Sequence, residues 1–253
     1  MSRYALPSIV RAPRMFGLIL PLVGTVALST ACTAAEDGSD ATPSSAATTS
    51  APASPTDQPS GSASAPTTIP TSAFVELPSE LRKSARRTTD VSAALPKLCA
   101  NEFGTGGRQV TASAAMTVTY KKAGEPDSNT PQGMIHQTIF TFDGDGAADY
   151  LRRLGDAVRA CPSFDQDGNK VTVQSKAVTG VGDEALLVTH TRPATSLGGE
   201  RTGGETSSQI AVARVDTVVT VFNDQGWEGS SGNPAILDRT MRDGVRVIDA
   251  WQS

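Results

Sequence analysis

The chain of 253 residues is poor in histidine, cysteine and aromatic residues, and each shortage narrows the functions open to it. It has two histidines, and its three cysteines form no paired-cysteine zinc motif. Lys and Arg number 22 against 26 Asp and Glu, a net charge of −4. Because nucleic-acid binders need a concentrated basic surface, we expect no nucleic-acid partner.

The N-terminal 31 residues have the composition of a secretory signal peptide. They hold three arginines, no acidic residue and then an uncharged apolar run, residues 15–28. As a helix rising ~1.5 Å per residue, this run reaches about 21 Å, short of the ~30 Å hydrocarbon core of a membrane. A signal peptide over residues 1–31 fits better than a membrane span, and its removal takes the net charge from −4 to −7 by subtracting three arginines.

Residues 28–32, Leu-Ser-Thr-Ala-Cys, resemble the bacterial lipobox, in which the cysteine is diacylated and becomes the first residue of the mature chain. Ser29 stands where the lipobox most often has Leu. The resemblance implies that Cys32 is the lipid attachment site and that the protein lies on the outer face of the plasma membrane, because two acyl chains anchor stably. The alternative is an ordinary signal cleaved near Ala31 or Ala35, which leaves Cys32 as a free thiol.

Residues 33–71 consist mainly of Ala, Ser, Thr and Pro, with Ile69 as the one branched aliphatic residue and no aromatic residue. Such a segment buries too little apolar area to offset the entropy lost on ordering, so we expect a disordered tether. In an extended polyproline-like state it would span up to ~120 Å. We place the lipidated cysteine and linker at residues 32–72 and the folded domain at residues 73–253.

Hydrophobic periodicity predicts several strands. Strict alternation places Val110, Ala112, Ala114, Met116, Val118 and Tyr120 on one face of a strand, which we expect to be its buried face. Residues 134–142 predict an antiparallel partner strand. Further strands are expected over residues 171–177, 184–192, 209–215 and 218–223, the last two as a hairpin.

Helices are expected between these runs of strands. Apolar residues recur at helical spacing over residues 147–161 and again from Pro234 to Trp251, with Pro234 at the first helical position. Residues 78–88 and 90–98 predict one or two short helices. The pattern predicts an α+β fold: a mostly antiparallel β-sheet with the two longer helices packed on one face.

Cys99 and Cys161 remain once Cys32 is assigned to lipid, an even pair in an oxidising compartment. We expect a disulfide between them, which would stabilise the domain by ~4 kcal/mol in the chain-entropy model. The competing interpretation is a catalytic or redox cysteine. It is weakened by the absence of a C-x-x-C motif and by the place of Cys161 on an apolar helix stripe.

Four short motifs have both a functional and a structural interpretation. Residues 180–185, Gly-Val-Gly-Asp-Glu-Ala, match a dinucleotide-binding pattern, but a strand follows where a helix is required, so we expect a tight turn. Residues 143–146 and 165–169 lack the twelve-residue calcium pattern and are expected to be turns. The basic cluster is expected on a solvated helix face, with anionic lipid or wall polymer as the rival partner: Arg82, Lys83, Arg86 and Arg87.

His136 and His190 fall in predicted strands, without the H-E-x-x-H spacing of a zinc site. A Ser-His-Asp triad needs a positioned nucleophile, and residues 229–232 lack the G-x-S-x-G elbow. Such a triad can still assemble in space, so the sequence leaves it open. We assign no catalytic residue, no metal and no cofactor, and expect each histidine to be satisfied by its neighbours.

Several pieces occur in a characteristic order: Phe142 and its turn before the helix that ends at Cys161-Pro162, the turn at residues 180–185, residues 213–215 before a hairpin, and a closing helix. Over roughly residues 90–251 this order resembles the PknH-like sensor domain, shared by a mycobacterial serine/threonine kinase and stand-alone actinobacterial lipoproteins. The resemblance implies an antiparallel sheet, a cleft for an envelope ligand and no enzymatic activity. The chain departs from it with one cysteine pair where the kinase domain has two bridges, and with Asp216 where Gly is usual.

The expected function is a non-enzymatic, membrane-anchored extracytoplasmic binding or sensor lipoprotein with a cleft for an unidentified cell-envelope ligand. The first alternative is a carrier that shields a lipid or glycolipid, and the second is an envelope hydrolase. A closed apolar tunnel would favour the carrier, and a shallow polar cleft the sensor. An acidic side chain oriented on His136 or His190, opposite an exposed Ser, would favour the hydrolase.

Overall fold

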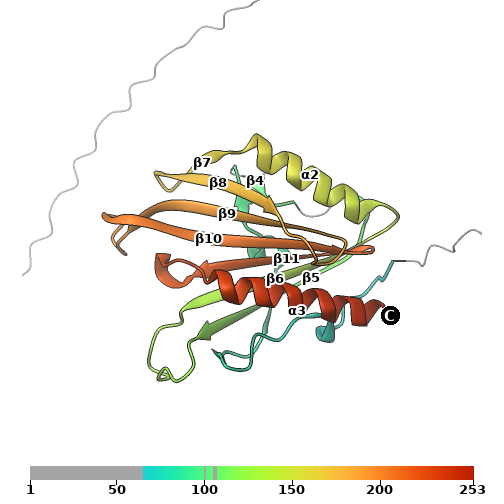
Figure 1. Ribbon diagram of the computed structural model, residues 1–253, viewed down its shortest axis with the longest axis horizontal. Helices are drawn as coiled ribbons and strands as arrows, with labels where there is room; N and C mark the ends of the chain where they lie inside the picture. The colour runs from blue at the N-terminus through green and yellow to red at the C-terminus, as the bar shows by residue number, and fades with distance from the viewer. Residues whose placement is uncertain (1–64, 100, 105–106) are drawn as a thin grey trace, which may run out of the picture. The chain divides into compact units, whose positions relative to one another are not determined.

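The computed structural model describes residues 65–99, 101–104 and 107–253. Within these residues nine strands form one antiparallel sheet in the spatial order β1-β5-β6-β11-β10-β9-β8-β7, with β2 also paired to β5 (Figure 1). The strands of this sheet are β1 (Arg82–Lys83), β2 (Arg87–Thr89), β5 (Val110–Lys121), β6 (Gly133–Phe142), β7 (Ser163–Gln166), β8 (Asn169–Ala177), β9 (Glu184–Thr195), β10 (Arg201–Val215) and β11 (Val218–Gly226). A separate two-stranded ribbon joins β3 (Lys97–Leu98) to β4 (Asn101–Glu102).

Two long helices accompany the sheet, α2 (Gly146–Ala160) and α3 (Pro234–Gln252), together with the four-residue α1 (Val91–Ala94). Single 3₁₀ turns lie at η1 (Thr71–Ala73) and η2 (Trp227–Gly229). The expected α+β class with a mostly antiparallel sheet is confirmed. In the part of the chain that the structure describes, every helix is too short or too polar to span a membrane.

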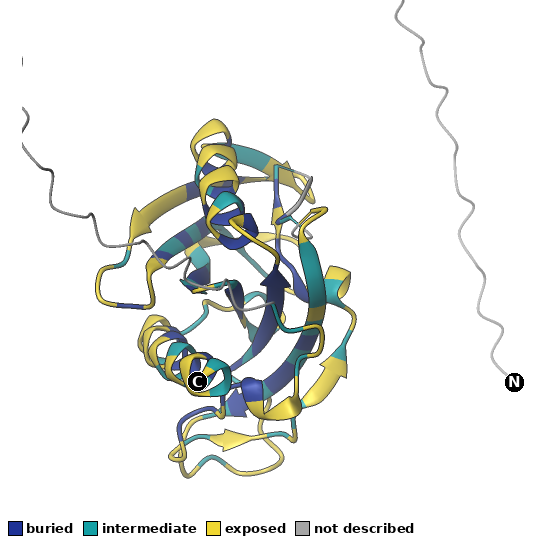
Figure 2. Cartoon of the chain, turned by 90° about the vertical axis from the view of Figure 1, so that its right-hand side faces the viewer, coloured by how far each residue is buried: buried dark blue, intermediate teal, exposed yellow. Residues whose placement is uncertain are grey.

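The two long helices pack on opposite faces of the sheet, so the expectation that both lie on one face was wrong. The apolar side of α2 packs against Phe140, Val212 and Val221. The apolar side of α3 packs against the strand neighbours of these residues, such as Ala211 and Phe222. Because alternate strand residues point to opposite faces, each face has its own core. In Figure 2 the buried strands run between two helices whose outer sides are exposed.

The reason for this arrangement lies in the central strands. In β6 and β11 nearly every residue is buried, so neither strand has a face suited to water. A strand that is buried on both faces needs a cover on both sides. In the sequence, the residues of β6 and β11 do not alternate between apolar and polar. This lack of alternation could have predicted that α2 and α3 cover opposite faces of the sheet.

The β5–β6 pair is antiparallel as expected, but a bulge changes one assignment. Val110 pairs with Phe142 and Ala112 with Thr141, so one extra residue of β5 lies between two pairs. A bulge of this kind moves the preceding side chain to the other face. Val110 therefore contacts the core under α2, whereas Met116 and Tyr120 lie on the α3 side. The prediction that Val110 shares one face of the strand with these residues was wrong.

The start of α3 is fixed by contacts with the sheet. The Asn233 side chain accepts hydrogen bonds from the N–H groups of Ala235 (3.1 Å) and Ile236 (3.2 Å), an N-cap that agrees with the predicted helix start at Pro234. Further along, a Cβ at Gly244 would lie 2.4 Å from the ring of Phe222. Glycine at this position therefore allows the helix to lie close to β11.

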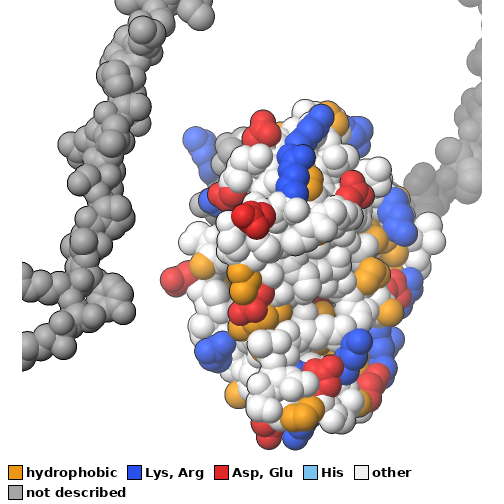
Figure 3. Space-filling model, turned by 90° about the vertical axis from the view of Figure 1, so that its left-hand side faces the viewer, with side chains coloured by type: hydrophobic (Ala, Val, Ile, Leu, Met, Phe, Trp, Pro, Cys, Tyr) orange, Lys and Arg blue, Asp and Glu red, His pale blue; other side chains and the backbone are white. Residues whose placement is uncertain are grey.

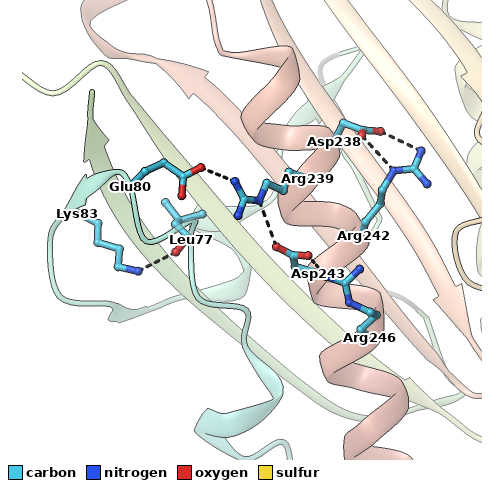
Figure 4. A network of polar contacts seen from close by, with 8 residues as sticks. All are labelled: Leu77, Glu80, Lys83, Asp238, Arg239, Arg242, Asp243 and Arg246. Atoms are coloured by element: carbon cyan, nitrogen blue, oxygen red, sulfur yellow. Dashed lines mark hydrogen bonds and ion pairs between the residues drawn. The ribbon is translucent and has the colours of Figure 1, made fainter. Parts of the chain in front are cut away.

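On the exposed face of α3, charged side chains of the helix form ion pairs with one another. Arg242 binds Asp238 one turn earlier, at 3.1 Å, and Asp243 lies between Arg239 and Arg246 (Figure 4). Arg239 also pairs with a glutamate of the segment before β1. These residues are spaced at i, i+3 and i, i+4, where oppositely charged side chains of a helix meet. This face is therefore a solvated helix surface.

Two expectations about the N-terminal part were wrong. Residues 78–88 form no helix, because residues 82–83 and 87–89 pair with β5 as β1 and β2. The folded part also begins before residue 73. The carbonyl of Pro66 accepts hydrogen bonds from the hydroxyls of Thr111 (2.9 Å) and Thr141 (2.8 Å), and Ile69 packs against the core. The one aliphatic residue of the predicted linker thus belongs to the domain.

Candidate functional site

Cys32 and the predicted signal peptide lie outside the described residues, so the lipid attachment site stays a prediction. Cys99 and Cys161 are joined in a disulfide with their Cα atoms 6.0 Å apart, which fits the expected pairing. Cys99 lies between β3 and β4, and Cys161 is the C-cap of α2. The bridge therefore ties the β3–β4 ribbon to the end of the helix.

The basic cluster, residues 82–87, lies on β1, β2 and the turn between them. Arg86 pairs with Glu76 at 2.8 Å. Lys83 Nζ donates to the carbonyl of Leu77 at 2.7 Å (Figure 4). These bonds fasten the segment before β1 to the edge of the sheet, which gives the cluster a structural role.

The two acidic motifs lie in turns. Residues 165–169 include the β7–β8 turn, in which Asp167 has φ +52° and Gly168 has φ +76°. Residues 143–146 lead into α2, with the Gly146 N–H donating to the Asp143 carbonyl. Among the described residues no group of three or more His, Cys, Asp or Glu side chains is placed to hold a metal ion.

Residues 180–183 form a turn that leads into β9 at Glu184 and is hydrogen-bonded to the β10–β11 hairpin. The Asp183 carboxylate accepts hydrogen bonds from the Asp216 N–H (2.7 Å) and the Arg214 guanidinium (3.0 Å). Gly182 has φ +57°, and a Cβ there would lie 2.2 Å from the Arg214 carbonyl oxygen. Asp216 itself has φ +48°, a conformation that Asp tolerates better than most residues. The glycines of this motif therefore serve a turn, and β9 follows it.

The two histidines share the α2 side of the sheet but are three strands apart, roughly 14 Å by strand spacing. The Nδ1 of His136 is hydrogen-bonded to the Thr117 hydroxyl at 2.7 Å, as expected for a histidine satisfied by its neighbours. Burial lowers its pKa. Among the described residues neither histidine is paired with a carboxylate, so the orienting acid of a triad is lacking.

His190 lies in a different environment, a pocket of about 300 Å³ that we call the polar pocket. Its floor consists of side chains from β9, β10 and β11 that point to the α2 side, beyond the region that α2 covers. The segment that leads from α1 into β3 contributes to its wall Leu95, Pro96 and Lys97, the last of which is the first residue of β3. The remaining lining residues are Gln166, Val171, His190, Arg192, Thr206, Ser207, Ser208, Asn223, Gln225, Gly226 and Ser230.

Strand register explains how these side chains come together. His190 pairs with Ser208 across β9 and β10, and the next pair on the same face is Arg192 with Thr206. Cross-strand partners of this kind have their Cβ atoms about 5 Å apart. Four polar side chains are therefore adjacent on rigid backbone.

Two atoms of the polar pocket are buried without a hydrogen-bond partner: Nε2 of His190 and Oγ1 of Thr206. His190 is only 9% exposed and packs edge-on against Phe164. Burial lowers its pKa to about 4, so the imidazole is neutral at pH 7. A buried polar atom left without a partner costs about 1–3 kcal/mol, and water or a bound molecule can supply the missing bond.

A second pocket, which we call the apolar groove, lies beside α2 and the Cys99–Cys161 bridge and has a volume of about 620 Å³. Apolar side chains line it both from α2, such as Leu154, and from the chain on either side of β4, such as Leu98 and Phe103. This volume is within the range of small-molecule sites, ~300–1,000 Å³.

Sequence reasoning found His190 but missed Thr206, Ser207 and Ser208. These residues belong to the first half of β10, which the hydrophobic pattern placed in a connection because the strand was expected to begin at residue 209. The segment from Arg201 to Ser208 is polar and rich in glycine, so it carries no alternation. Its pairing with the predicted strand β9 defines it as a strand.

No protein-family model matches the chain, and a search of curated proteins finds no match. Among solved structures, the chain is similar to the extracellular domain of PknH from Mycobacterium tuberculosis, with 15% sequence identity and a TM-score of 0.44. The similarity covers 69% of this chain and 86% of that chain. A similarity of this extent carries no argument about function.

Proposed function

We propose that the protein is a non-enzymatic binding module, anchored by lipid at Cys32 to the outer face of the plasma membrane, that holds a small polar molecule of the cell envelope in the polar pocket. The lipobox-like sequence and the predicted tether support the location. Two acyl chains suffice for stable attachment. The predicted tether, now the residues between Cys32 and the first contacts of the domain at Pro66, would hold the domain clear of the lipid headgroups.

One observation carries the binding function: His190 Nε2 and Thr206 Oγ1 are both buried in the polar pocket and both lack a partner. A structure that leaves two adjacent polar groups unsatisfied loses stability unless water or a bound molecule supplies the missing hydrogen bonds, and a polar ligand can bond both groups at once. The imidazole and the hydroxyl can each donate or accept a hydrogen bond. They are therefore suited to the hydroxyl and amide groups of a polar ligand.

Binding accounts for the pocket better than catalysis does. A general base works best when its pKa is near the working pH, whereas the pKa of His190 is about 4. Neither His190 nor His136 has an acidic partner among the described residues to hold a protonated ring. We therefore assign the polar pocket to recognition.

A lipid carrier is the second candidate, and the apolar groove is the observation that favours it. The groove is about twice as large as the polar pocket and its lining is mainly apolar. In that case an acyl chain would lie between α2 and the disulfide bridge.

Native mass spectrometry of the full-length protein purified from its own envelope tests the proposal. We expect a non-covalent adduct that is lost from the double variant His190→Phe/Thr206→Val, because both changes remove the free polar atoms while keeping an aromatic ring and a β-branched side chain in place. Ala157→Trp is the matched control, since Ala157 is exposed and lines the apolar groove. An adduct that survives the double variant and is lost from Ala157→Trp would favour the carrier, and the absence of any adduct would contradict both.

A further inference from the structure

The charges of the polar pocket indicate which class of molecule it binds. Among the described side chains, its lining includes two cations, Lys97 and Arg192, and no Asp or Glu. Neither cation has an ion-pair partner among the described residues. Most of the described arginines, such as Arg86, Arg214 and Arg242, do have such a partner, so Arg192 belongs to the minority that do not.

The excess of positive charge is local. Figure 3 faces the end of the molecule that carries the β7–β8 turn and the β9–β10 loop, and there Lys, Arg, Asp and Glu side chains are interspersed. The chain as a whole is acidic, with a net charge of −4. A general attraction for anions is therefore not expected, and two cations beside a pocket that have no ion-pair partner among the described residues point to a specific negative group.

The positions of the polar groups add a second requirement. Arg192 lies directly across from Thr206, and on this face of the sheet the next pair is His190 with Ser208. A guanidinium fork binds a carboxylate or phosphate through two parallel hydrogen bonds. The imidazole and hydroxyls beyond it are then placed to bind hydroxyl groups on the same molecule. A volume of about 300 Å³ suits a small ligand.

We infer that the polar pocket binds a small hydroxylated anion, whose carboxylate or phosphate is held by Arg192 and Lys97 and whose hydroxyl groups bind His190 and Thr206. This inference rests on the proposed binding function and specifies its ligand class. It assigns Arg192 to the charge of the ligand and His190 with Thr206 to its hydroxyl groups.

Calorimetric titration of the full-length protein with matched sugars tests the inference. Glucuronate, glucose 6-phosphate, glucose and glucosamine share a hydroxylated ring and differ in charge. We expect one or both anions to bind roughly tenfold or more tightly than glucose, because hydrogen bonds to charged groups are the stronger ones. Preference between glucuronate and glucose 6-phosphate separates a carboxylate from a phosphate ligand.

Variants locate the effect. Arg192→Gln is expected to reduce anion binding to the level of glucose, and Lys97→Gln to weaken it, with circular dichroism checking that both fold. Arg87→Gln removes the same charge from an exposed strand outside the pocket and is expected to bind as the unmodified protein does.

The inference is overturned if glucose or glucosamine binds as tightly as the anions, if Arg192→Gln leaves anion binding unchanged, or if neither anion binds at about 10 mM. These failures differ from failure of the proposed function. An envelope adduct that is uncharged and depends on His190 and Thr206 would contradict the ligand class alone, whereas the absence of any adduct contradicts the binding function.

Discussion

Asp224 is a carboxyl group whose ionisation the fold disfavours. It is fully buried on β11, where it accepts hydrogen bonds from the Tyr120 hydroxyl (3.1 Å) and the Asn233 N–H (2.6 Å). Burial raises the pKa of Asp224 to about 6, since these two bonds offset only part of the lost hydration. The Asp224 side chain thus joins β5, β11 and the start of α3. Because its carboxyl group is buried, the unfolding free energy of the domain depends on pH.

The sign of this dependence follows from linkage. Between about pH 4 and pH 6 the folded state keeps a proton on Asp224 that the unfolded state has released, so stability falls as pH rises through this range, by up to about 3 kcal/mol. His190, with its pKa lowered to about 4, acts in the opposite sense, because its stabilising contribution is lost as pH falls from 6.5.

Comparison with Asp224→Asn isolates the carboxyl group, because His190 is common to both proteins. We predict that the unfolding free energy of the variant rises relative to the unmodified protein as pH increases from 4 to 7. Urea unfolding at each pH measures this. A difference that is constant across the range would contradict the assigned pKa.

Thr206 gives a second prediction at the residue scale. Its hydroxyl is buried without a partner, so Thr206→Val is expected to leave the ligand-free protein equally stable or more stable, by up to about 1 kcal/mol. Thr141→Val is the control, since the Thr141 hydroxyl bonds the Pro66 carbonyl, and it is expected to cost about 1 kcal/mol. Thermal unfolding of ligand-free protein compares them, and equal losses would argue that Thr206 has an internal partner.

At the scale of elements, the sequence predicts what hydrophobic periodicity controls. The β10–β11 hairpin, the β5–β6 pair and the start of α3 were expected and are present. The first half of β10 was missed because polar strands carry no alternation, and its position depends on β9. The bulge in β5 and the placement of the helices on opposite faces depend on tertiary contacts, which periodicity alone does not specify.

The turn at residues 180–185 provides the test at this scale. Gly182→Ala is expected to destabilise the domain by about 2–4 kcal/mol, because the new Cβ adds a clash with the Arg214 carbonyl to the cost of a positive φ. Gly180→Ala also has a positive φ, +68°, but meets nothing within 4 Å, so it is expected to cost about 1 kcal/mol. Chemical denaturation of both variants measures the difference, and equal losses would refute the contact.

At the scale of the whole molecule, the proposed function combines a lipid anchor, a tether and a domain with a pocket. The sequence indicated the first two from composition and a short motif, and it placed His190 in a strand. It did not indicate the pocket, because Arg192, Thr206 and Lys97 come from separate elements. Their proximity follows from the register of β9 with β10 and from the path of the chain between α1 and β3.

Loss of the lipid anchor is expected to change where the protein is found without changing the fold of the domain. We predict that Cys32→Ala releases the protein into the medium or leaves it unprocessed, while the domain keeps its fold, since no contact of the described residues depends on Cys32. Cell fractionation with an acyl-group label measures this. Membrane retention without any acyl label in the unmodified protein would contradict lipidation.

The most direct test of the binding function uses the two imidazoles of the chain. In nitrogen-15 spectra of the full-length protein, we predict that small molecules extracted from the envelope shift the Nε2 signal of His190, whose atom lacks a partner. The signals of His136, which is bonded to Thr117 outside the polar pocket, are expected to stay in place. A His190 signal that is unchanged at saturating extract, or equal shifts of both histidines, would contradict the account.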